Sequence, residues 1–98
     1  MYAVLRTYSG KGAKELFDVV EKHKDDVEKL MRSVKGFVSY SIAHTADGGF
    51  SVTIAEDQAG VEESLQKSRE WNSQHAAEAH ANAPIPTVLE GPVIILLK

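Results

Sequence analysis

The chain contains no cysteine among its 98 residues. Disulfide bonds, thiolate nucleophiles and zinc sites with cysteine ligands are therefore excluded. Long apolar runs are also missing, because no stretch approaches the roughly 18 residues of a membrane-spanning helix, and the first residues do not have the pattern of a secretory signal. We therefore expect a soluble cytoplasmic protein that does not engage a membrane.

An excess of positive charge is missing as well. The chain has 11 Lys and Arg against 14 Asp and Glu, which gives a formal net charge of −3. Most of the basic residues lie between Lys11 and Lys35, where acidic residues are interleaved with them, a pattern typical of a solvated helix surface. We therefore expect no nucleic-acid partner.

The first half of the chain alternates between strand and helix signals. Residues 1–9 read as a strand rich in Tyr, Val and Thr. Apolar residues at spacings of three and four then predict one amphipathic helix from Ala13 to Val34, and Gly36 stands where a left-handed C-terminal cap is expected. Two strand-like runs, FVSYSIAHT and FSVTIAE, are joined by ADGG, which predicts a hairpin because Asp and Gly tolerate positive φ.

The second half predicts one more helix and one more strand. Asp57 can cap a helix that continues until Pro84 disfavours it. TVLEGPVIILLK closes the chain as a strand, with Gly91 and Pro92 marking a bulge or kink. The order is β-α-β-β-α-β, so we expect a single α+β domain over residues 1–98, with a ferredoxin-like fold and an antiparallel sheet.

The apolar strands predict self-association. Two helices cover only one face of a single sheet, yet VIILL at 93–97 is apolar at every position and YAVL near the N-terminus is nearly so. Both faces of the sheet therefore favour burial. A chain this short hides only about 60 to 65% of its unfolded surface by itself, so further burial adds stability. We expect a homodimer in which two sheets pack face to face.

This order of elements carries a family resemblance. With GFVSYSIAHTADGGFSVTIAEDQAGVEES running into a helix that carries EW, and with a closing EGPVIILL, the chain resembles the antibiotic-biosynthesis-monooxygenase-like (ABM-like) domain of the dimeric α+β barrel superfamily, in particular its small stand-alone members. The resemblance covers essentially the whole chain and is most specific from Phe50 to Trp71. The superfamily also contains haem-degrading proteins, isomerases and stress-response barrels, so the resemblance identifies the fold better than the chemistry.

The resemblance implies an activity and two of its residues. The family's oxygenases act without metal or flavin on polycyclic phenols held between helices and sheet, where an Asn and a Trp are implicated. Asn72 and Trp71 match those roles here, and no cofactor is implied. The haem-degrading branch uses an Asn on the first strand together with a helix Trp and a helix His. This first strand carries Arg6 and Thr7 instead, which argues against haem degradation.

The helix that contains SREWNSQHAAEAH has polar residues where apolar ones are expected. At about 100° per residue, one stripe of this helix should face the core. The stripe contains Val61, Leu65, Ser68, Asn72, Ala76 and Ala79. A buried amide without partners costs roughly 1 to 3 kcal/mol, so Ser68 and Asn72 either bond to each other or face a cavity. Trp71 and His75 flank the stripe, where each packs at the boundary or contributes to that cavity.

Histidines supply the titratable groups of this region. His75 and His80 are five residues apart, about 140° around the helix, which is not the spacing of a helical metal pair, and we expect no metal site. His23 falls within the apolar stripe of the first predicted helix, either as a satisfied core histidine or as part of a pocket. If both helices lie on one sheet face, His23, Asn72 and His75 converge on one pocket with Ser68.

The strands contribute further polar side chains. Arg6 shares one face of the first strand with Tyr8, and it either pairs with an acid across the dimer or binds an anionic ligand. Tyr40 and Tyr8 offer phenol hydroxyls to a pocket or simply pack. His44, close to the hairpin turn, is expected at the surface.

Two functions compete on these observations. The first is a cofactor-independent monooxygenase, or an isomerase, that acts on a small aromatic or polyketide-like compound, with His23 or His75 as general base and Asn72 stabilising the anion. The second is a non-catalytic dimeric barrel that binds a small hydrophobic or aromatic ligand or serves a stress response. The expected ligand-binding residues are Arg6, Tyr40, Ser68 and Trp71.

Overall fold

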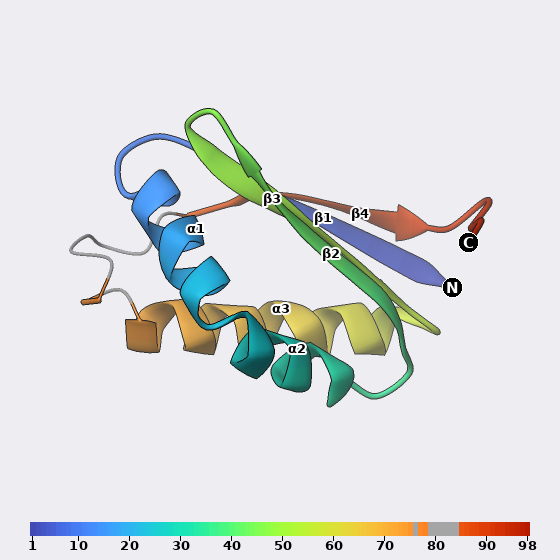
Figure 1. The fold of residues 1–98 in the computed structure, drawn as a ribbon. Helices are drawn as coiled ribbons and strands as arrows, with labels where there is room; N and C mark the ends of the chain where they lie inside the picture. Colours follow the sequence, from blue (N-terminus) through green and yellow to red (C-terminus); the bar gives the residue numbers. More distant parts are fainter. Residues whose placement is uncertain (76, 79–84) are drawn as a thin grey trace.

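The computed structural model describes residues 1–75, 77–78 and 85–98. These residues contain four strands and three helices. The strands are β1 (Tyr2–Tyr8), β2 (Phe37–Thr45), β3 (Gly48–Ala55) and β4 (Thr87–Pro92), and the helices are α1 (Ala13–Lys22), α2 (Lys24–Arg32) and α3 (Gln58–His75). The strands form one antiparallel sheet in the order β2-β3-β1-β4, with the helices on one face (Figure 1). The predicted ferredoxin-like α+β arrangement is therefore confirmed. None of the described helices is both long and apolar enough to cross a membrane.

The first predicted helix is divided in two. α1 and α2 meet at His23, which leaves the helical region with φ −108° and ψ 29°. Hydrogen bonding continues through the break, since Val27 N still donates to His23 O at 3.1 Å. The prediction of one continuous helix is wrong at this residue, because the His23 ring is held by contacts with Trp71 and Glu78, which come from a distant part of the chain.

α3 begins where the sequence predicts and ends earlier. The Asp57 carboxylate accepts a hydrogen bond from Gly60 N at 2.9 Å, which confirms the predicted N-cap. The helix ends at His75, and Glu78 lies in a turn in which its N–H bonds to the His75 carbonyl. The predicted continuation is therefore wrong at 77–78, where the turn brings Glu78 onto His23. The rest of that prediction, including His80, falls outside the described residues.

The hairpin between β2 and β3 is present, but its glycines do not have the predicted purpose. Gly48 and Gly49 are not among the glycines with positive φ. A Cβ on Gly49 would overlap the Phe17 ring, and one on Gly48 would overlap the carbonyl oxygen of Tyr8. These two glycines therefore allow β3 to approach β1 and α1 closely. Gly36 does have a left-handed φ of 75°, although it lies in the loop before β2 and not at the end of α2.

The closing strand is shorter than predicted. β4 ends at Pro92, and in residues 93–98 the backbone bonds once to the first strand's end, from Val93 N to Met1 O at 2.9 Å. Ile94, Ile95 and Leu97 are exposed by 94%, 73% and 86%. The prediction of one strand to the end of the chain is wrong, because the neighbouring strand β1 begins at Tyr2, which pairs with Pro92.

The two faces of the sheet differ in polarity. The register places Arg6 beside Ser51, and Val4 beside Thr53, on the face that the helices cover. The opposite face, which we call the open face, carries Leu5, Phe50, Val52, Ile54 and Leu89. Leu89 is 64% exposed. The covered face is therefore polar at its centre, while these five side chains give the open face an apolar patch.

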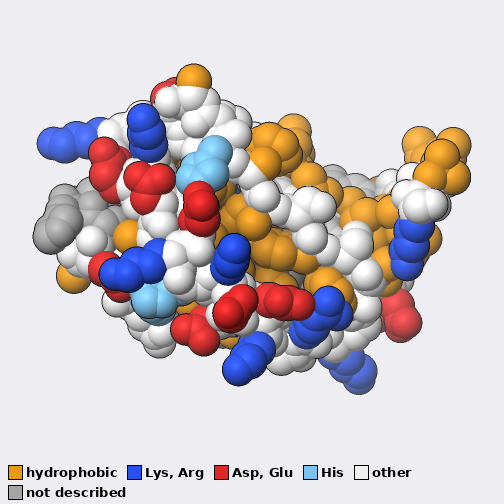
Figure 2. All heavy atoms as spheres, in the orientation of Figure 1, with side chains coloured by type: hydrophobic (Ala, Val, Ile, Leu, Met, Phe, Trp, Pro, Cys, Tyr) orange, Lys and Arg blue, Asp and Glu red, His pale blue; other side chains and the backbone are white. Residues whose placement is uncertain are grey.

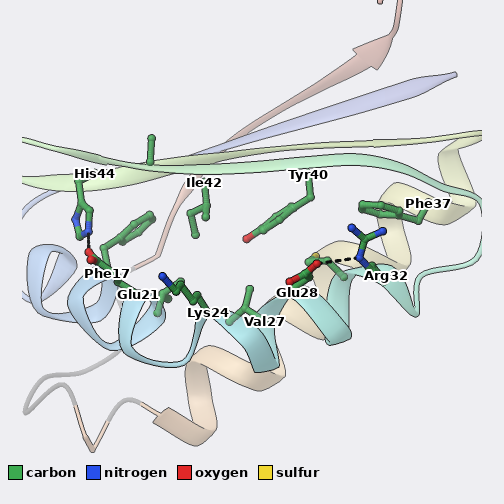
Figure 3. Close-up of a pocket in the computed structure, with 13 residues that line it drawn as sticks. Phe17, Glu21, Lys24, Val27, Glu28, Arg32, Phe37, Tyr40, Ile42 and His44 are labelled. Atoms are coloured by element: carbon green, nitrogen blue, oxygen red, sulfur yellow. Dashed lines mark hydrogen bonds and ion pairs between the residues drawn. The ribbon is translucent and has the colours of Figure 1, made fainter. Parts of the chain in front are cut away.

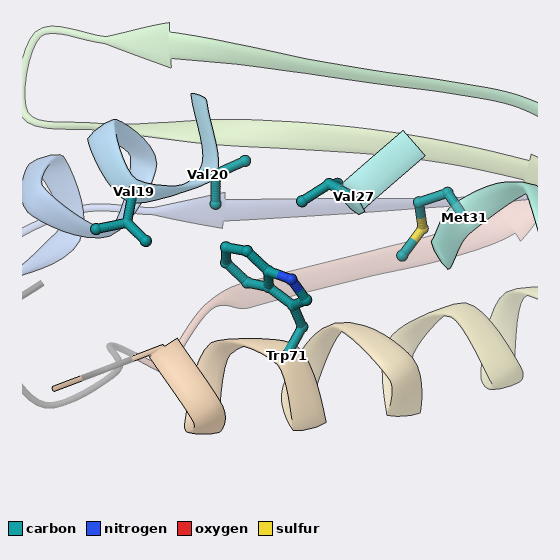
Figure 4. Close-up of a cluster of buried hydrophobic side chains, with 5 residues drawn as sticks. All are labelled: Val19, Val20, Val27, Met31 and Trp71. Carbon is teal, nitrogen blue, oxygen red and sulfur yellow. The ribbon is translucent and has the colours of Figure 1, made fainter. Parts of the chain in front are cut away.

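The core between sheet and helices contains three clusters of buried apolar side chains. One of them joins Val19 and Val20 of α1, Val27 and Met31 of α2, and Trp71 of α3 (Figure 4). Trp71 is only 8% exposed, whereas Asn72 is half-buried. The buried side of α3 is therefore rotated toward Trp71 relative to the predicted stripe, because α1 and α2 pack beside α3 and cover the indole.

Candidate functional site

A groove of about 560 Å³ runs between β2 and the helices α1 and α2. Hydrophobic side chains gather in this hollow, and charged side chains lie on the helices beside it (Figure 2). Phe37, Tyr40 and Ile42 of β2 point from the sheet toward the helices (Figure 3). We call this space the outer groove. It is lined by Phe17, Val20, Glu21, Lys24, Val27, Glu28, Met31, Arg32, Phe37, Tyr40, Ile42, Ala43 and His44.

A smaller space of about 30 Å³ adjoins the groove, and we call it the inner chamber. The two spaces share Phe17, Val27, Met31, Tyr40 and Ile42 as lining residues. The rest of the chamber is lined by Arg6, Tyr8, Leu16, Leu30, Ser51, Ser68, Trp71 and Asn72. Its wall toward β1 and β3 is polar, so an apolar groove leads to a polar end.

Arg6 is the only charged side chain among the described residues that line the inner chamber. It is 3% exposed, and its Nε atom has no hydrogen-bond partner within the described part of the chain. The Ser51 hydroxyl beside it is likewise buried without a partner. A buried cation without an acid is costly unless an anion or a polar group offsets it. The chamber is therefore suited to an oxyanion.

Two phenol groups reach the same chamber. Burial raises the pKa of the Tyr40 phenol above its ordinary value of 10.0, and the nearby Arg6 guanidinium only partly offsets this effect. Tyr40 therefore keeps its proton at neutral pH. The Tyr8 hydroxyl accepts a hydrogen bond from Asn72 Nδ2 at 3.2 Å, which leaves its own proton free to be donated. Arg6 and these phenols together form a set of donors for negative charge on oxygen.

The polar residues of α3 also face this chamber. Ser68 and Asn72 both line it, as expected if they face a cavity. Trp71 lines it as well while packing against α1 and α2 (Figure 4). The indole is therefore both a core residue and a wall of the site.

The two histidines proposed as bases lie elsewhere. Neither His23 nor His75 is among the described residues that line the groove or the chamber. The centroids of their two rings are 5.2 Å apart. The His75 ring also stacks on Trp71, with centroids 3.9 Å apart. The pocket predicted for four residues is therefore divided: Asn72 and Ser68 line the chamber, and the histidines meet at the end of α3.

One groove residue was placed only at the surface by the sequence. His44 is exposed, but it lines the outer groove, and its Nε2 lies 2.6 Å from Glu21 Oε1. The sequence did indicate that His44 shares a face with Tyr40 and Ile42, because alternate residues of a strand point to the same side. Which face the helices cover was the missing information.

Comparisons with known proteins identify structures with the same fold as this chain. No protein-family model matches the chain, and no curated protein matches it significantly. A monooxygenase from the gene ActVA-Orf6 of Streptomyces coelicolor, solved in complex with the ligand Nanaomycin D, is similar over 99% of this chain and 91% of its own, with a TM-score of 0.66 and 17% identity. NE2512, a protein of unknown function from Nitrosomonas europaea, has the same coverage and TM-score, with 13% identity.

A third similar structure is a dimeric ferredoxin-like protein from an uncultured marine organism. It has a TM-score of 0.62 and 14% identity over 98% of this chain and 94% of its own. At such identities the likeness shows the fold and not the activity. The chain has the ferredoxin-like α+β fold that these structures share.

Proposed function

We propose that the protein binds a planar phenolic or enolisable aromatic compound in the outer groove and oxidises it with molecular oxygen, without a bound cofactor. The observation that carries the proposal is Arg6, a guanidinium that is 3% exposed and has no acidic residue among the described lining residues of its chamber. The monooxygenase similar to this chain supports the reaction class.

The chamber and the groove bind different parts of the ligand. The chamber's volume of about 30 Å³ admits only an oxygen-bearing edge of a ring, whereas the groove's 560 Å³ accommodates the ring system itself. Phe17, Phe37 and Ile42 offer apolar contacts along the groove. A ligand with one acidic oxygen and a flat apolar body fits both parts.

The reaction requires a substrate that can become an anion. A methylene group of the substrate ring loses a proton, and the negative charge that remains delocalises onto the oxygen attached to the ring, beside Arg6. The resulting anion then reduces molecular oxygen. One oxygen atom enters the product as a carbonyl, and the other leaves as water with the two methylene hydrogens. Tyr40 and Tyr8 stabilise the charged oxygen by donating hydrogen bonds, and Asn72 orients Tyr8.

The proton acceptor is assigned to His44. Its imidazole lines the outer groove and is hydrogen-bonded to Glu21, the pairing that orients a general base. His23 and His75 line neither space within the described residues, so they are assigned no contact with the substrate.

The assembly is proposed to be a homodimer. The open face carries Leu5, Val52 and Leu89, and the apolar residues after β4 are exposed beside it. The dimeric ferredoxin-like protein of the same fold supports this arrangement. Light scattering coupled to gel filtration should report a dimer for the native chain and a monomer for Leu89→Lys. A monomeric native chain at micromolar concentration would remove the proposal.

The activity is tested by oxygen uptake with a hydroxylated anthrone as substrate. We expect turnover by the native chain and loss of both binding and turnover in Arg6→Met, because the oxyanion then lacks its cation. Arg69→Met, which removes an exposed guanidinium on α3, is the matched control and should behave as the native chain does. Equal activity in both variants would contradict the role of Arg6.

Binding without turnover is the second candidate function. The observation in its favour is that the base, His44, lies in the groove and not in the chamber. A ligand would then bind as its anion, and its absorption spectrum would shift to that of the anion at a pH below its solution pKa. A binding protein would be identified by three results together: this spectral shift with the native chain, loss of the shift in Arg6→Met, and no oxygen uptake.

A further inference from the structure

Three side chains that line neither the outer groove nor the inner chamber meet at the end of α3. His23 comes from the junction of α1 and α2, His75 is the last residue of α3, and Glu78 lies in the turn that follows. Their potential ligand atoms all lie within 4.8 Å of one another. We call these three residues the His-Glu cluster.

The tautomer of His75 leaves one of its ring nitrogens free to bind a ligand. His75 Nδ1 lies 2.8 Å from the Trp71 carbonyl oxygen, an acceptor, so Nδ1 carries the hydrogen and Nε2 has a free lone pair. His23 Nδ1 faces the Asp26 carboxylate at 3.9 Å, and its Nε2 faces Glu78. Metal-binding histidines typically donate their second N–H to a carbonyl or carboxylate, as His75 does to the Trp71 carbonyl.

The third ligand, Glu78, already lies close to His23. His23 Nε2 lies 3.0 and 3.1 Å from the two Glu78 oxygens. A neutral imidazole nitrogen and a carboxylate are both electron donors, so a proton or a cation must lie between them. His75 adds a further potential ligand atom within 4.8 Å of the other two, which favours a cation that can accept all three.

We propose that the His-Glu cluster binds a divalent transition-metal ion of the Zn²⁺ type. Two imidazoles and one carboxylate form a known three-residue ligand set for such ions, with the remaining position left to water. Zinc bonds of about 2.0 to 2.1 Å bring tetrahedral ligand atoms to about 3.4 Å apart. The cluster therefore has to contract slightly, which rotation of the partly exposed Glu78 side chain permits.

One neighbouring charge opposes this binding. Lys22 Nζ lies 3.2 Å from Glu78 Oε2, and its side chain is 71% exposed. A metal ion at the cluster displaces this ammonium into solvent, where it is readily hydrated. The competition predicts that removing Lys22 tightens metal binding.

The position of the cluster gives the ion a structural role. It ties the α1–α2 junction to the end of α3, and His75 stacks on Trp71, which is a wall of the inner chamber. The ion orders that wall without touching the chamber. This inference departs from the sequence-based expectation of no metal site, which considered only spacings within one helix, and it does not depend on the proposed activity.

The experiment uses tag-free, chelator-treated protein at slightly alkaline pH. Zn²⁺ affinity is measured by competition with a chromogenic chelator, and Co²⁺ is followed by its ligand-field absorption and by quenching of Trp71, the only tryptophan of the chain. We expect one equivalent of metal per chain. Affinity should fall at least tenfold in His23→Gln, His75→Ala and Glu78→Gln, and it should rise in Lys22→Met.

His44→Gln is the matched control, because His44 also pairs with a glutamate but belongs to no such cluster among the described residues. Its metal affinity should equal that of the native chain. An equal loss in His44→Gln, unchanged affinity in the cluster variants, or no saturable Co²⁺ spectrum would overturn the proposal. Far-UV circular dichroism identifies any histidine variant that does not fold, and Glu78→Gln, which changes an exposed residue, then decides the question.

Discussion

The ring of His75 lies parallel to the indole of Trp71, with centroids 3.9 Å apart and an angle of 14° between the planes. The indole is 8% exposed and lines the inner chamber, whereas the imidazole is half-buried and belongs to the His-Glu cluster. This stacked pair therefore connects the wall of the proposed binding site with the proposed metal site. The two rings should contribute very differently to stability.

Trp71→Ala should lower the free energy of unfolding by about 3 to 5 kcal/mol, because the indole fills the space between three helices. His75→Ala should cost only about 0.5 to 1.5 kcal/mol, since it removes ring contacts with Trp71 and His23 from a half-buried position. Urea unfolding followed by circular dichroism measures both values. Similar costs for the two variants would mean that the indole is not a core residue.

Arg6→Met should raise the free energy of unfolding by about 1 to 4 kcal/mol in the absence of ligand, because it replaces a buried guanidinium with an apolar side chain of similar volume. The exposed Arg69→Met should change it by less than about 0.5 kcal/mol. Thermal and urea unfolding measure the difference. A destabilised Arg6→Met would show that the native chain already compensates this charge.

Asn72 and Tyr8 should be energetically coupled. The amide donates to the phenol oxygen at 3.2 Å, so a cycle of Asn72→Ala, Tyr8→Phe and the double variant should give about 0.5 to 1.5 kcal/mol of coupling. The same cycle with Tyr2→Phe in place of Tyr8→Phe serves as control, because Tyr2 lies at the other end of β1. Zero coupling in the first cycle would contradict the hydrogen bond.

Gly49→Ala should destabilise the fold by about 1 to 3 kcal/mol, because the added Cβ would overlap the Phe17 ring in a tightly packed region. Gly91→Ala is the matched control, since a Cβ there would meet no atom within 4 Å. Midpoints of urea unfolding compare the two. A tolerated Gly49→Ala would indicate that α1 can move away from β3.

Acidification should weaken the contact between Glu78 and His23. The hydrogen bond from His23, and then that from Lys22, lowers the pKa of Glu78 from its ordinary value of 4.5. Because the unfolded chain binds this proton more readily, the contribution of Glu78 is full above about pH 4.5 and disappears as the pH falls through the lowered value.

The measurement is urea unfolding of the native chain and Glu78→Gln across the acidic range, in the presence of a chelator. The two stabilities should differ near neutrality and converge at low pH. Glu62→Gln, which changes an exposed carboxylate on α3, controls for the general effect of removing a carboxylate. A difference that stays constant down to low pH would contradict the interaction.

Part of the candidate site could be predicted from the sequence. Ser68 and Asn72 were recognisable because polar residues occupied positions where a helix needs apolar ones, and both line the chamber. Arg6 stood out in the same way within an apolar strand. His44 could not be assigned to the groove, because strand alternation identifies two faces but not the one that the helices cover.

The sequence by itself determined the order of elements, the N-cap at Asp57 and the two faces of the sheet, because these follow from local periodicity and hydrogen bonding. Only the tertiary structure decided where the helices break. The division at His23 and the turn after His75 depend on contacts between residues far apart in the chain. Local periodicity carries no information about such contacts, and for that reason the meeting of His23, His75 and Glu78 became visible only in the folded chain.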